Sequence, residues 1–161
     1  MLRFLLPLAL LPLPAAACGA GETTVLSCTA RQTTRLLEVC IAGDLIRYSY
    51  GKPGRAPDLS LSEPVATVLH EPWAGVGRSI WEETTFLNEG HAYEVFISTD
   101  RMDETHPTDG GVSVTKGGAE VARIDCDPGS ATIGLWAVSD AKAARGVCWD
   151  PGNHRWGGCS N

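Results

Sequence analysis

Short alternating segments separated by turn-forming residues run through most of the chain and limit its fold more than any other feature. In residues 45–50, for example, Ile46, Tyr48 and Tyr50 share one face of an extended strand. Similar runs rich in β-branched and aromatic residues are bounded by glycine, proline and asparagine. About eight strands at this spacing predict a mainly β fold, a single antiparallel β-barrel or sandwich. The expected strands are residues 24–28, 35–41, 45–50, 58–62, 78–87, 92–99, 111–115 and 119–125.

Glycine-containing turns predict which of these strands are neighbours. Residues 42–44, 88–91 and 116–118 each place glycine in a short connection between two strand-like runs. Residues 51–57 contain two prolines and two glycines, so they form a loop. The turns therefore predict antiparallel hairpins.

The C-terminal region changes character. Ser139 is a candidate N-cap for a short helix that ends at Gly146, with Arg145 at the negative end of the helix dipole. Residues 151–161 show no periodicity and are expected to form an irregular tail. The sequence thus predicts a short C-terminal helix packed on the β domain.

The N-terminus has the layout of a secretory signal peptide. Arg3 precedes an apolar run over residues 4–13, and three alanines follow just before Cys18. The run is too short to span a bilayer, and no later run is long enough to do so. We therefore expect a signal peptide over residues 1–17, a disulfide-bonded domain over residues 18–150, and export to the periplasm or the medium with no transmembrane segment after cleavage.

The six cysteines all lie in the predicted mature chain, where disulfides persist. No Cys-x-x-Cys motif is present, and no histidine stands at zinc-site spacing, so bridges are favoured over metal or redox sites. We expect Cys28, Cys40, Cys126 and Cys148 to be bridged, with either Cys28 or Cys40 joined to Cys126.

Cys18 and Cys159 are harder to assign because they lie near the chain ends. Cys18 follows a small-residue run, as the lipidated cysteine of a bacterial lipoprotein does. However, Ala15 stands where the usual lipoprotein motif has leucine. A bridge at Cys18 gives an even cysteine count, whereas lipidation leaves one cysteine over. A bridged Cys18 is the preferred interpretation, and a lipoprotein is the alternative.

Net charge narrows the possible partners. Removing Arg3 leaves twelve basic against nineteen acidic residues, a mature charge of −7. Nucleic-acid binding requires a basic face, so it is not expected. Dispersed acidic charge serves solubility and would also suit a cationic partner.

Residues 72–78 form the most unusual local pattern, with an aromatic, two glycines and an arginine ahead of the longest strand. Glycine lets a backbone approach a partner closely, and tryptophan and arginine often anchor interfaces. The alternative is a structural bend, in which the tryptophan plugs one end of the barrel and the arginine pairs with Glu82 or Glu83. The candidate binding residues are Trp73, Gly75, Gly77 and Arg78.

No catalytic residue, cofactor or metal site is predicted. The four histidines are scattered, and Glu82 and Glu83 point to opposite faces of a strand, so they cannot share one substrate. An acidic loop is expected to be solvated, with calcium binding as the alternative. Its residues are Asp100, Asp103, Glu104, His106 and Asp109.

Several short motifs stand together along the chain: Ser27-Cys28, Val39-Cys40, residues 48–52, 59–62, 73–78 and 121–126, and Cys148-Trp149-Asp150. As a set they resemble an uncharacterised family of small secreted proteobacterial proteins, which implies export and fold but no activity. A second similarity is to periplasmic inhibitors of c-type lysozyme, small antiparallel barrels with a disulfide joining the chain ends, which insert a Ser-Gly-x-x-Tyr loop into the enzyme cleft. That resemblance implies a Cys28–Cys126 bridge and a similar place for residues 73–78, although the Ser-Gly-x-x-Tyr motif is absent.

These observations favour a non-enzymatic binding protein of the cell envelope, with a lysozyme-like hydrolase as one possible partner. Two alternatives remain open. One is a carbohydrate- or peptidoglycan-binding module that uses Trp73, Trp81 and Tyr93, because aromatic faces stack on sugars. The other is an envelope enzyme whose site is assembled in space rather than in sequence.

Overall fold

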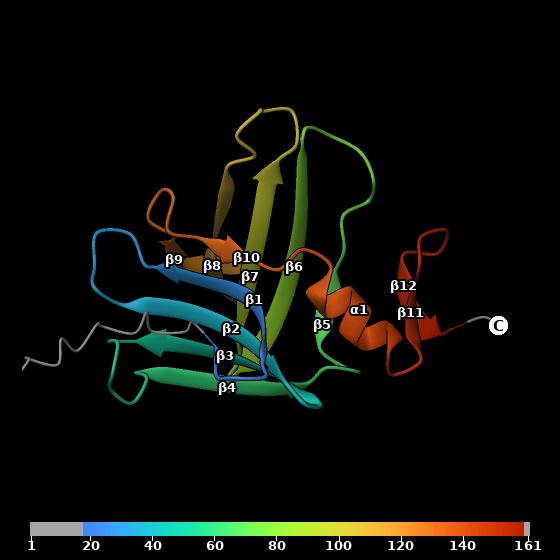
Figure 1. Cartoon of the computed structure of the whole chain (residues 1–161). Coiled ribbons are helices and arrows are strands. Elements are labelled where there is room, and N and C mark those ends of the chain that lie inside the picture. The colour runs from blue at the N-terminus through green and yellow to red at the C-terminus, as the bar shows by residue number, and fades with distance from the viewer. Residues whose placement is uncertain (1–17, 160–161) are drawn as a thin grey trace, which may run out of the picture.

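Two open antiparallel sheets pack against each other in the computed structural model, which describes residues 18–159 (Figure 1). The predicted signal peptide, residues 1–17, lies outside the described residues. The sheets do not close on themselves, so of the two predicted architectures the sandwich is the one observed. In Figure 1 the first sheet runs across the view and β6 and β7 of the second stand upright, so the sheets cross steeply.

The first sheet has the strand order β10-β1-β2-β3-β4, and every neighbouring pair is antiparallel. The hairpin from β2 to β3 places Ala42 opposite Leu45, which confirms the turn predicted at residues 42–44. Its strands are β1 (Thr23–Thr29), β2 (Leu36–Ala42), β3 (Leu45–Gly51), β4 (Leu59–Pro64) and β10 (Thr132–Ile133).

The second sheet follows the chain, in the order β5-β6-β7-β8-β9. Asn88 pairs with His91 across the turn from β6 to β7, where Glu89 and Gly90 both have positive φ, as a two-residue hairpin turn of this type requires. Its strands are β5 (Leu69–Glu71), β6 (Ser79–Asn88), β7 (His91–Asp100), β8 (Thr108–Lys116) and β9 (Ala119–Asp125). In this sheet only β5 had no counterpart among the expected strands, and in the first sheet β10 had none.

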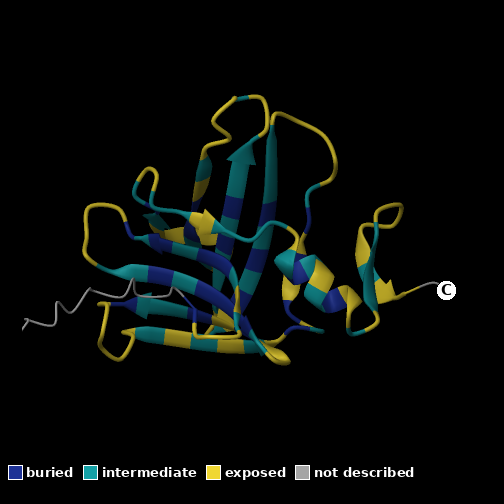
Figure 2. Ribbon diagram, viewed as in Figure 1, coloured by how far each residue is buried: buried dark blue, intermediate teal, exposed yellow. Residues whose placement is uncertain are grey.

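The core lies between the two sheets and is built from alternate residues of each strand. On β6 the inward positions are Glu82, Thr84 and Phe86, all buried. Tyr48 of the first sheet meets Phe86 and Tyr93 of the second, with ring centroids 5.8 and 5.9 Å apart. Figure 2 shows this buried interior and, at the top of the view, exposed loops that extend beyond it.

The short helix α1 (Ala137–Ala143) begins three residues earlier than an N-cap at Ser139 would place it, and Ser139 is not its N-cap. Trp136 holds that position in the left-handed conformation, with φ 68°, and makes no side-chain cap. Its backbone N–H instead donates to Glu82 Oε2 at 2.8 Å. A buried carboxylate from the second sheet therefore fixes the start of the helix. No helix among residues 18–159 is long and apolar enough to cross a membrane.

The C-terminal segment is more ordered than predicted. Instead of an irregular tail, residues after Asp150 turn back to form β12 (Arg155–Gly158), which pairs with β11 (Val147–Asp150). A bridge from Cys148 to Cys159 closes this hairpin, and the Trp156 indole N–H donates to His70 O at 2.7 Å. The Trp156 contact ties β12 to a residue 86 positions away in the sequence, which composition alone does not reveal.

Three disulfides connect the described cysteines, and no cysteine among residues 18–159 is free. Cys28 is joined to Cys126, Cys18 to Cys40, and Cys148 to Cys159. The Cys18 sulfur is held in a bridge, so it is not available for a thioether to lipid in this structure. Three bridges fit an oxidising, extracytoplasmic environment.

Candidate functional site

The loop of residues 72–78 lies at the upper end of the second sheet, beside the loop of residues 101–107 that joins β7 to β8 (Figure 1). It connects β5 to β6 and turns sharply at Gly75 and Gly77, whose φ angles are 84° and 96°. Residues other than glycine rarely adopt this backbone conformation, so the turn requires glycine at both positions. The predicted binding loop is therefore a protruding edge of the sandwich.

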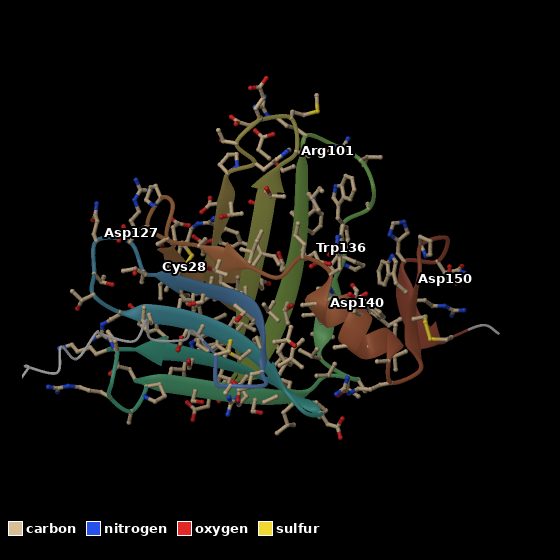
Figure 3. All side chains as sticks on the ribbon, viewed as in Figure 1. Cys28, Arg101, Asp127, Trp136, Asp140 and Asp150 are labelled. Atoms are coloured by element: carbon tan, nitrogen blue, oxygen red, sulfur yellow. A yellow bond between two sulfur atoms is a disulfide. The ribbon has the colours of Figure 1, made fainter. Side chains whose placement is uncertain are left out.

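Trp73 is held in place by both loops. Its indole N–H donates to Val76 O at 2.7 Å, and the Arg101 guanidinium lies 5.0 Å from its ring centroid. The Trp136 ring is 6.4 Å away, and Figure 3 shows Arg101 at the upper end of the second sheet with Trp136 below it. Trp73 thus does not plug one end of a barrel. It contacts residues of the two loops at the upper end of the second sheet.

Arg78 pairs with Asp100, not with Glu82 or Glu83. Arg78 Nε donates to Asp100 Oδ2 at 2.6 Å because Ser79, the first residue of β6, is opposite Asp100 in the β6–β7 register. The Met102 backbone N–H and then the Arg78 side chain lower the pKa of Asp100. The Arg78 side chain is 68% exposed, and neither terminal guanidinium nitrogen has a partner among residues 18–159.

Large apolar side chains are exposed around these two residues. Val76 is 72% exposed and Met102 68%, one on each loop, and Trp136 is 39% exposed. We call the residues that the two loops bring together the apex surface. They are Trp73, Val76, Arg78, Arg101 and Met102.

The three aspartates of the acidic loop accept hydrogen bonds from nearby residues. Asp103 accepts hydrogen bonds from the Thr105 backbone N–H and hydroxyl, and these lower the pKa of Asp103. Asp109 accepts one from the Gly110 N–H. Among residues 18–159, only Cys18, Glu22 and Cys40 bring three potential metal ligands within 4.8 Å of one another, and two of these are joined in a disulfide.

A buried polar cluster beneath α1 was not foreseen from the sequence. His70 Nδ1 lies 3.0 Å from Thr84 Oγ1, while His70 Nε2 lies 3.3 Å from Ser139 Oγ and 3.7 Å from Glu82 Oε1. In a hydrolase triad the carboxylate bonds the ring nitrogen opposite the serine, whereas here both face the same nitrogen. The His70 and Glu82 side chains are only 1% exposed, so the cluster attaches α1 to the sheet rather than meeting solvent.

The aromatic residues proposed for sugar binding do not form one surface. Trp73 belongs to the apex surface, and Tyr93 points inward against Tyr48. Trp81 alternates with the buried Glu82 on β6 and so lies on the outer face of the sheet. The alternation also confirms that Glu82 and Glu83 point to opposite faces.

A groove lies between the outer face of β5 and β6 and the hairpin of β11 and β12, with a cavity of about 470 Å³. We call it the hairpin groove. Glu71 and Glu83 line it from the sheet, Trp149, Arg155 and Trp156 from the hairpin, and Lys142 from α1.

No protein-family model matches the chain, and neither the curated proteins nor the solved structures contain a match. The similarity to lysozyme inhibitors therefore stays a prediction from the sequence.

Proposed function

We propose that the protein is a periplasmic or secreted, non-enzymatic binding protein that docks another protein through the apex surface. One observation carries this proposal. The two loops lock each other through the Arg101–Trp73 and Arg78–Asp100 contacts, yet leave Val76, Met102 and most of Arg78 exposed. Contacts of this kind fix the shape of the two loops while the side chains that would meet a partner stay exposed.

A fixed loop favours binding because less conformational freedom is lost on association. Tryptophan and arginine are also the residues that most often dominate interface energies. Here the arginine presents two unpartnered terminal nitrogens beside apolar side chains. This combination suits an apolar pocket that contains a carboxylate, since a guanidinium can bind a carboxylate through two parallel hydrogen bonds.

A lysozyme-like hydrolase is the partner we propose, because its cleft carries catalytic carboxylates. Two features support this choice. The sequence resembles lysozyme inhibitors in its antiparallel β architecture and in the place of residues 73–78, and the chain has the Cys28–Cys126 bridge that the resemblance implies. The mature charge of −7 would also assist encounter with a cationic partner.

The test is inhibition of a purified c-type lysozyme by the oxidised mature protein, with affinity measured by calorimetry. Arg78→Ala should weaken binding by about 2 kcal/mol or more, roughly thirtyfold. Arg55→Ala is the matched control, because Arg55 is an exposed arginine of the loop between β3 and β4 with no side-chain hydrogen bond or ion pair among residues 18–159. Absence of inhibition by the wild-type protein, or equal affinity of the two variants, would overturn the proposal.

A further inference from the structure

The hairpin groove holds carboxylates that lack a counter-charge. Glu71 and Glu83 line it directly opposite each other on β5 and β6, and Glu94 lies outside the groove on β7, opposite Thr85. Like charges in this arrangement repel. None of the three carboxylates has a hydrogen bond or an ion pair among residues 18–159. Burial raises the pKa of Glu83, and the charges of Glu94 and Glu71 raise it further.

Neither basic residue that lines the groove from the hairpin or the helix forms an ion pair with the glutamates of the sheet. Lys142 donates to Ala66 O at 3.2 Å and lies 4.9 Å from the Trp156 ring centroid. Arg155 is opposite Asp150 in the β11–β12 pair, and its side chain has no hydrogen bond or ion pair with Glu71 or Glu83 among residues 18–159. Neither cation neutralises Glu71 or Glu83, so the sheet side of the groove remains negative.

The opposite wall of the groove is aromatic and fixed. Trp149 and Trp156 contact each other with centroids 5.4 Å apart, and His154 meets Trp149 edge-on at 6.2 Å. The Cys148–Cys159 bridge holds the strands that carry these rings. A tryptophan face attracts cations, and the Lys142 ammonium already uses Trp156 in this way.

We propose that the hairpin groove binds a basic side chain, lysine or arginine, presented by a polypeptide. The aliphatic part of such a side chain would lie along Trp149, and its charged end would reach Glu83 and Glu71. An extended cation fits better than a metal ion, because the three glutamates do not bring their oxygens within 4.8 Å of one another. The groove is a second surface, and the proposal does not depend on the function assigned to the apex surface.

The probe is tri-arginine amide, titrated into the ¹⁵N-labelled oxidised protein at low ionic strength. The indole N–H resonance of Trp149, assigned with a Trp149→Phe variant, reports on the groove itself. We expect a saturable shift of this resonance that added salt reverses. The Glu83→Gln variant should bind the probe roughly fivefold or more weakly, because it loses one partner of a partly desolvated charge pair.

Two controls give the experiment its specificity. Glu63→Gln makes the same charge change on β4, where Glu63 has no side-chain partner among the described residues, and should bind as the wild type does. Arg78→Ala should also bind normally, which separates this proposal from the apex surface. An unshifted Trp149, equal weakening by both glutamine variants, or a shift with neutral chitotriose instead of tri-arginine would each overturn the proposal.

Discussion

Removal of the Cys28–Cys126 bridge is the most severe change that the disulfide pattern predicts. This bridge joins β1 of the first sheet to the residue that follows β9 of the second, across a sequence separation of 98. In the chain-entropy model, closing a loop of roughly 100 residues restricts the unfolded chain by about 4.7 kcal/mol at 25 °C. The Cys148–Cys159 bridge closes a separation of only 11 and gives about 2.8 kcal/mol by the same relation.

We expect the variant with Cys28→Ala and Cys126→Ala to lose about 2 kcal/mol more stability than the variant with Cys148→Ala and Cys159→Ala. Cys28 and Cys126 are also buried, at 2% and 3% exposure, so lost packing adds to the difference. Urea unfolding followed by tryptophan fluorescence measures both free energies, provided the m-values agree. An equal or larger loss in the Cys148 and Cys159 variant would refute the reasoning, because loop length would then not set the ranking.

Two further predictions follow from charges in the groove. Glu83→Gln should raise the free energy of unfolding at neutral pH by about 0.2–1 kcal/mol, because it removes like-charge repulsion across β5 and β6. Because the pKa of Glu83 is raised in the folded protein, this gain is present above the unfolded glutamate pKa. It disappears in acid, where the Glu83 side chain is neutral in both the folded and the unfolded protein. Urea unfolding at pH 7 and at about pH 3 checks this. Burial lowers the pKa of Lys142, so stability should rise with pH between that lowered pKa and about 10.4, and Lys142→Met should abolish the rise in the same assay.

Local sequence signals predicted the sheets well because hairpins are local structures. The turns at residues 42–44, 88–91 and 116–118 carry glycine where the backbone needs positive φ, and each joins strands that pair in the structure. Alternation along β6 likewise predicted that Glu82 and Glu83 would face opposite sides. A barrel and a sandwich differ in whether the edge strands pair with each other, and the alternation within a strand does not report on that pairing.

Contacts between distant residues explain the incorrect predictions. Ser139 resembled an N-cap, but Glu82, 54 residues before Trp136, supplies the acceptor at the start of α1. Ser139 is then free to contact His70, 69 residues away. Arg78 was assigned to Glu82 or Glu83 by nearness in sequence, whereas the β6–β7 register brings Asp100 to it. In each case a partner of suitable chemistry lay close in sequence, and the fold supplied a different one.

β5, one of four strands that the sequence did not predict, connects the two proposed surfaces. β5 has only three residues, too few for alternation to be recognised, and the Trp156 indole bonds to the carbonyl of its central residue, His70. Its last residue, Glu71, lines the hairpin groove, and the chain then continues through Pro72 to Trp73 of the apex surface. The negative groove and the guanidinium-bearing apex are therefore joined by two peptide units. A partner with neighbouring basic and acidic groups would engage both surfaces. If the two contacts form independently, the losses of binding free energy in Arg78→Ala and Glu83→Gln add in the double variant.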